Sequence, residues 1–134
     1  MQITLNENEL LDLDPNQPAL LQLEKRLKIK ELKVEASRRI QTIDGKYYSD
    51  IDWLRKSQNF QDIETAYFIS LINKQTPTPS EIEAHSEARK ELTKKDSVIV
   101  LYKEIKELIN TLTLPEDVEV FDVANPSNWA GSLV

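Results

Sequence analysis

The stretch from Pro18 to Ile43 is the longest uninterrupted helical signal in the chain, and it limits the possible folds more than any other feature. Its apolar residues recur at steps of three, four and once five, which places them on one face of a helix. This stripe comprises Leu20, Leu23, Leu27, Leu32, Ala36, Ile40 and Ile43. Asn16 is placed to cap the first turn, and Asp44-Gly45 tolerates positive φ just beyond the last. The sequence predicts a helix over 18–43 on which the other segments dock.

Three further apolar residues of this helix, Leu21, Ile29 and Val34, lie off the main stripe. A single helical hairpin would leave them in water, so we predict that they contact a second neighbour, in this chain or in another. Phe121 and Trp129 lie in a C-terminal tail where exposed aromatic residues would be unusual. The candidate partner-binding residues are therefore Leu21, Ile29, Val34, Phe121 and Trp129.

The polar face of the same helix is basic. Residues 24–39 hold seven Lys or Arg and three Glu, a local net charge of +4. One interpretation is a surface for nucleic acid or an acidic partner, using the basic face of residues 25–39. The other is a solvated face with ion pairs such as Glu24–Lys28, and we favour it because no aromatic residues interleave the charges. Residues 1–23 and 113–134 each carry four acidic residues and no basic ones, so acidic ends flank the basic helix.

Further helices are predicted at about 50–57, 61–74 and 80–112 from apolar spacing and from two capping boxes, Ser49 with Asp52 and Ser80 with Glu83. Two points stay open. Gly45 either ends the first helix or kinks it, and residues 80–112 form one helix or two joined near Asp96. After Pro115 the segment EDVEVFDV has strand-like residues, which predicts an extended tail.

The predicted fold class is mainly α. Long amphipathic helices form an antiparallel helical hairpin or bundle, with short extended or β segments at both termini. The predicted organisation is an extended N-terminal arm over 1–17, a helical domain over 18–113 and an extended C-terminal tail over 114–134.

Composition argues against most enzyme classes. Two glycines are too few for a Rossmann or phosphate-binding loop, and the absence of cysteine excludes thiolate zinc sites and thiol catalysis. His85 is the single histidine, and with Glu81 one turn earlier it is expected to form a surface pair and no metal site. We therefore expect no catalytic, cofactor-binding or metal-binding residues. A net charge of −6 disfavours nucleic acid as a partner, and no apolar run of membrane-spanning length occurs, so no membrane contact is expected.

Six aromatic residues occur within 22 positions, and helical spacing favours a core between helices over a binding cage. They are Tyr47, Tyr48, Trp53, Phe60, Tyr67 and Phe68.

The segment EASRRIQTIDGKYYSDIDWLRKS, which begins at Glu35, resembles small helical proteins of tailed bacteriophages that are encoded among tail and baseplate genes. The likeness is carried by Ala36, Arg38, Arg39, Ile40, Tyr47 and Tyr48, and by the closing Asn-Pro-Ser-Asn-Trp from Asn125. It implies a non-enzymatic structural or assembly protein of the virion, in the tail, baseplate or fibre, located in the virion or the host cytoplasm. Its expected partners are proteins, either copies of itself in a homo-oligomer or a larger virion assembly.

Overall fold

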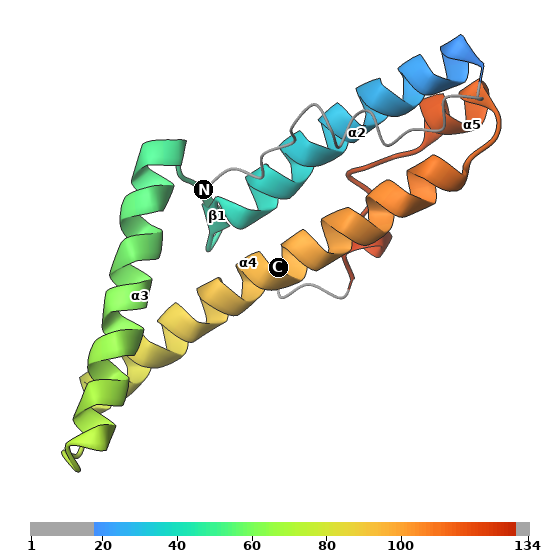
Figure 1. Cartoon of the computed structure of the whole chain (residues 1–134). Helices are drawn as coiled ribbons and strands as arrows, with labels where there is room; N and C mark the ends of the chain where they lie inside the picture. The colour runs from blue at the N-terminus through green and yellow to red at the C-terminus, as the bar shows by residue number, and fades with distance from the viewer. Residues whose placement is uncertain (1–17, 131–134) are drawn as a thin grey trace.

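A computed structural model describes residues 18–130 of the chain (Figure 1). Three long helices, α2 (Ala19–Ile40), α3 (Asp50–Ile72) and α4 (Pro79–Thr111), make up most of it. A two-stranded hairpin, β1 (Thr42–Ile43) and β2 (Lys46–Tyr47), joins α2 to α3. A short helix, α5 (Pro115–Val120), and a 3-10 helix, η1 (Pro126–Trp129), follow α4. The mainly α prediction with packed long helices is confirmed.

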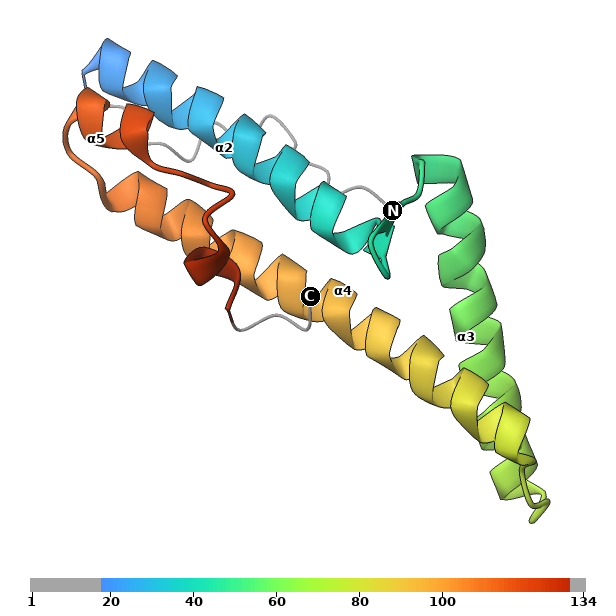
Figure 2. The same cartoon turned by 180° about the vertical axis from the view of Figure 1, so that it is seen from behind.

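Helix α4 organises the fold, a role that the sequence had suggested for the first helix. Both α2 and α3 pack on α4, α5 packs on α2, and η1 lies against α4. Figures 1 and 2 show α3 and α2 leaning on different halves of α4, so that the far end of the α3–α4 hairpin projects away from the rest. With 33 residues, α4 is about 50 Å long, which lets one helix carry two separate packing surfaces.

Helices α2 and α3 both run antiparallel to α4. Lys25, early in α2, contacts Asn110 at the end of α4, and Thr42, just after α2, contacts Lys94 near the middle of α4. Helix α2 is therefore antiparallel to α4. Helix α3 is joined to α4 by a short connection that contains Pro77, and these two helices form the predicted antiparallel hairpin.

The structure confirms the predicted N-cap at Ser49 and moves the second capping box. Ser49 accepts a hydrogen bond from the Asp52 amide and caps α3 as predicted. Helix α4 is capped by Thr78, which exchanges hydrogen bonds with Glu81, so the box lies two residues before the predicted Ser80–Glu83 pair. Thr78 can serve because Pro79 is tolerated in the first helical turn, where its missing N–H costs nothing.

Two predictions about helix continuity are now decided. Residues 80–112 form one helix, since α4 continues through Asp96. The two helices predicted at 50–57 and 61–74 are a single helix, α3, so that prediction was wrong. Asn59 costs a helix only a few tenths of a kcal/mol, roughly, and burial of the neighbouring Phe60 in the core outweighs this.

Gly45 neither ends nor kinks the first helix, which stops at Ile40 with Gln41 as its C-cap. Ile43 pairs with Lys46 across a two-residue loop in which Asp44 and Gly45 both have positive φ, 49° and 81°. This is the pattern of a type I′ turn, which Asp-Gly favours strongly. The helix therefore stops at Ile40, and Ile43 belongs to a strand.

The C-terminal segment was predicted to be extended, and this was wrong for residues 115–120. Pro115 opens α5, and Glu116 and Asp117 lie in its first turn, where acidic residues stabilise the helix dipole. Val118 is fully buried, so packing against α2 stabilises a helix that is too short to form alone. The extended arm predicted over 1–17 lies outside the described residues, as do residues 131–134.

The buried face of α2 is not the predicted stripe. Leu32, Ala36 and Ile40 are buried as predicted, but Leu20, Leu23 and Leu27 are exposed. The core positions in the first half of the helix are instead Leu21 and Ile29. Both stripes are apolar and regularly spaced, so periodicity alone could not decide which one α4 and α5 would cover.

Candidate functional site

The five predicted partner-binding residues do not form one surface. Leu21, Ile29 and Trp129 are buried in the chain's own core, so their prediction as contacts for another molecule is corrected. Phe121 is half-buried against the same core. Val34 alone is freely accessible, at 69 % exposure. Leu21 and Ile29 lie instead on the buried face of this helix, which packs on α4 and α5 within the chain.

Two lysines of the basic face are buried and hydrogen-bond to the backbone of other helices. The Lys25 ammonium group donates to the backbone carbonyl of Asn110 at 2.7 Å, and Lys28 donates to the carbonyl of Glu119 at 3.0 Å. These carbonyls lie in the last turns of α4 and α5, where backbone oxygens lack helical partners and the helix dipole is negative. Lys25 is fully buried and Lys28 nearly so. Neither lysine is therefore available to an external ligand.

Two arginines of the same face share one carboxylate. Arg38 donates to Glu35 at 2.6 Å and 3.1 Å, and Arg39 donates to it at 2.9 Å. Burial by itself would raise the pKa of the Glu35 carboxyl, but the hydrogen bonds and positive charges of Arg38 and Arg39 outweigh burial and lower it. The hydrogen bond to Glu35 raises the pKa of Arg38, although desolvation opposes it. Arg39 also lies over the ring of Trp129, 5.0 Å from its centroid, and this contact ties η1 to α2.

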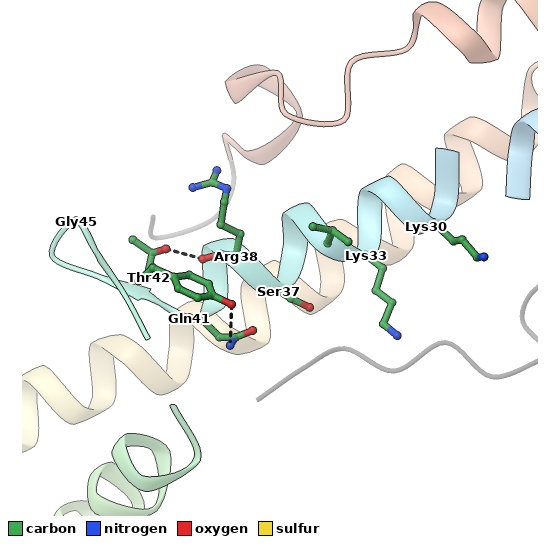
Figure 3. A pocket seen from close by; sticks show the side chains of 9 residues that line it. Lys30, Lys33, Ser37, Arg38, Gln41, Thr42 and Gly45 are labelled. Atoms are coloured by element: carbon green, nitrogen blue, oxygen red, sulfur yellow. Dashed lines mark hydrogen bonds between the residues drawn. The ribbon is translucent and has the colours of Figure 1, made fainter. Parts of the chain in front are cut away.

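A groove of about 750 Å³ lies at the C-terminal end of α2, beside other residues of the basic face (Figure 3). We name it the α2 groove, and it is lined by Lys30, Lys33, Val34, Ser37, Arg38, Gln41, Thr42, Gly45 and Tyr47. In Figure 3 Lys30 and Lys33 point to one side of the groove and Arg38 to the other. The hairpin brings Tyr47 to this groove, where the Gln41 amide donates to its hydroxyl at 3.4 Å. The groove thus combines three cations with apolar surface.

The exposed leucines of α2 continue this groove along the helix. Leu20, Leu23 and Leu27 follow each other at steps of three and four, and the same register leads on through Lys30 to Val34. We name Leu20, Leu23, Leu27 and Val34 the outer stripe. It lies on the opposite side of α2 from the core residues Leu21, Ile29 and Leu32, because these are offset by roughly half a helical turn.

A second apolar surface lies at the free end of the α3–α4 hairpin. Five large apolar residues are exposed there, and Ile72 has the highest exposure, at 77 %. We name this set the α3 tip, and it consists of Phe68, Ile69, Leu71, Ile72 and Ile82. Figures 1 and 2 show this end of the hairpin extending beyond the rest of the described chain.

His85 lies next to this tip, in an aromatic cluster. Its ring stacks on Tyr67 with centroids 3.9 Å apart, and Phe68 meets it edge-on at 5.4 Å. The expected pairing of His85 with Glu81 is replaced, because Glu81 hydrogen-bonds to the Thr78 backbone in the capping box. The six aromatic residues divide accordingly. Trp53 and Phe60 belong to the core, whereas Tyr47 and Phe68 are largely exposed.

Among residues 18–130, no three acidic or histidine side chains gather closely enough to hold a metal ion. Within the same residues, no helix has the length and hydropathy needed to cross a membrane. Comparisons of the chain with protein-family models, with curated proteins and with solved structures found no significant match.

Proposed function

We propose that this chain is a non-enzymatic structural or assembly protein that docks on a protein partner through the α3 tip. The observation that carries the proposal is the exposure of Phe68, Ile69, Leu71 and Ile72 at the projecting end of the α3–α4 hairpin. Monomeric soluble proteins rarely expose contiguous apolar surface of this kind unless it contacts another molecule. Between Ile63 and Ile82 the only charged side chains are Glu64, Lys74 and Glu81, so the tip offers mainly apolar contacts.

The biological setting that we propose is a bacteriophage virion, in the tail, baseplate or fibre. The resemblance of residues 35–57 to small phage proteins supports this setting. A projecting apolar hairpin fits it too, because assembly proteins bury such surfaces between subunits. Tail or capsid genes beside the coding sequence would support the setting, and a neighbourhood of metabolic genes would oppose it.

Self-association through the tip can be tested with the full chain. We expect light scattering to show a mass that rises with protein concentration, and the double variant Ile69→Glu, Ile72→Glu to remain a monomer. The matched control is Val100→Glu, which places a charge at a similarly exposed apolar position of α4 away from the tip. It should associate like the wild type. A monomer at every concentration would rule out the homo-oligomer, and equal effects of both variants would rule out the tip as the contact.

A second candidate function is binding of nucleic acid in the α2 groove. It is favoured by Lys30, Lys33 and Arg38 beside the exposed ring of Tyr47, because bases stack on aromatic rings between phosphate contacts. The net charge of −6 places it second. The test is a mobility shift at two salt concentrations with Lys30 and Lys33 changed to Gln. Binding that is insensitive to both salt and substitution would exclude the groove.

A further inference from the structure

The α2 groove and the outer stripe form one continuous surface that no described element covers. Leu20, Leu23 and Leu27 lead along α2 to Val34, and Lys30, Lys33 and Arg38 accompany the second half of this path. The second half of this path therefore favours an occupant that is both apolar and acidic. This surface lies on a different helix from the α3 tip, so its occupant is independent of the function proposed for the tip.

One segment of the chain has the required chemistry. Residues 1–17 carry Glu7, Glu9, Asp12 and Asp14 without a basic side chain, and they interleave these acids with apolar residues. The apolar residues are Ile3, Leu5, Leu10, Leu11 and Leu13. Acidic side chains beside Lys30 and Lys33 would gain charge-assisted hydrogen bonds, and the leucines would remove Val34 from water.

The segment is also long enough to reach the groove. Pro18 adjoins the first turn of α2, so the segment begins where the outer stripe begins. Lys30 lies about 18 Å further along the helix axis and Arg38 about 30 Å. An extended chain that runs back along α2 covers these distances in about six and nine residues, at ~3.3 Å per residue. In that arrangement Asp12 would lie level with Lys30, and Glu9 would lie level with Arg38.

We propose that the acidic N-terminal segment, residues 1–17, docks on the α2 groove of its own chain and on Val34 beside it. Attachment at Pro18 favours the same chain over a second copy, because a short connection gives an effective concentration of order mM. Docking would cover the exposed Val34 and the groove cations. A protein partner with an acidic, leucine-containing segment would have to displace residues 1–17 to reach the same surface.

The chain has no cysteine, so disulfide formation between two engineered cysteines reports how close they lie without interference from native thiols. Val34 is 69 % exposed, and docking of an extended segment would place Leu11 beside it. We expect the variant Leu11→Cys, Val34→Cys to form an intramolecular disulfide under mild oxidation. The matched control is Leu11→Cys, Val100→Cys, which offers a thiol of similar exposure on α4. It should react at least tenfold more slowly. Equal rates for the two pairs would overturn the proposal, and so would a disulfide found only between two chains.

Charge reversal tests whether opposite charges hold residues 1–17 on the α2 groove. In the Leu11→Cys, Val34→Cys background, Lys30→Glu with Lys33→Glu should slow disulfide formation about tenfold, and Asp12→Lys with Asp14→Lys should do the same. Combining all four reversals should restore most of the rate, because opposite charges again face each other. A quadruple variant as slow as either double variant would overturn the charge match. Circular dichroism of each variant confirms that the helices are retained.

Discussion

The ammonium group of Lys25 donates to the backbone carbonyl of Asn110 across 85 residues of sequence, at 2.7 Å. This bond joins the first turns of α2 to the last turn of α4. A second lysine, Lys28, makes the same kind of bond to the end of α5. Two side chains that look like solvent-facing charges in the sequence therefore satisfy the backbone oxygens of helix ends, which would otherwise be buried without partners.

Replacing Lys25 with Met keeps the apolar stem but removes the donor. We expect the free energy of unfolding to fall by about 1–3 kcal/mol, because the Asn110 carbonyl loses its partner in a buried site. Urea denaturation measures this. The control is Arg26→Met, an exposed position on the same helix, which should change stability by less than about 0.5 kcal/mol. Equal losses of unfolding free energy in both variants would show that the Lys25–Asn110 hydrogen bond makes no specific contribution to stability.

The ion pairs of Glu35 make stability depend on pH. The pKa of this carboxyl in the folded chain lies below its ordinary value of 4.5, so its contribution is fully present above that pH and is lost as pH falls through the folded pKa. We expect Glu35→Gln to lower the free energy of unfolding by about 1–2 kcal/mol at pH 7, and the difference from wild type to shrink by pH 3.

The control for this experiment is Glu104→Gln, an exposed position on α4. Its difference from wild type should stay within about 0.5 kcal/mol at both pH values. A Glu35→Gln effect that is as large at pH 3 as at pH 7 would show that the side chain acts by packing and not by charge.

A buried ion pair lies in the middle of α4. Lys94 and Glu91 are 2.7 Å apart with side chains 4 % exposed, and Lys94 also donates to the carbonyl of Thr42 in the hairpin. Either Glu91→Leu or Lys94→Met leaves a buried group without its charge partner, and each should cost about 3–5 kcal/mol. The double variant should cost less than the sum by about 1–3 kcal/mol. Additive losses in this double-mutant cycle would mean that the two groups are not coupled.

Gly45 tests the hairpin loop. Its φ of 81° is strained for any residue with a side chain, although a Cβ atom there would meet no neighbour within 4 Å. Gly45→Ala should therefore lower the free energy of unfolding by about 1–2 kcal/mol through backbone strain alone. Gly45→Asn should cost less, because Asn adopts this conformation more readily. Thermal unfolding followed by circular dichroism measures both, and a neutral Ala variant would contradict the turn assignment.

Several features of the fold arise from local sequence. The mainly α class, the antiparallel packing of long amphipathic helices and the cap at Ser49 were predicted because helical spacing and capping residues act over a few neighbouring positions. The β-hairpin at 42–47 could also have been predicted from the sequence. Asp44-Gly45 between Thr-Ile and Lys-Tyr is a strong type I′ signal, but the long apolar stripe before it suggested a helix end instead.

The candidate surfaces were predicted less well. Val34 was identified as accessible, whereas Leu21, Ile29 and Trp129 were assigned to a partner and are core residues. The α2 groove could not be found in the sequence, since its Tyr47 comes from a different element than Lys30 and Lys33. The α3 tip shows in the sequence only as a run of apolar residues, which would look the same in a buried helix.

The sequence alone determined that the chain forms long amphipathic helices, because periodicity and capping are local properties. Only the tertiary structure decided which face of α2 is buried, because its two apolar stripes are equally regular and α4 and α5 can cover just one. The same choice turned Lys25 and Lys28 inward to the carbonyls of Asn110 and Glu119 and left Lys30 and Lys33 at the surface. Whether a lysine bonds inside the fold or stays accessible to a ligand depends on which segment packs beside it. For Lys25 and Lys28 that segment lies about 90 positions away in the sequence.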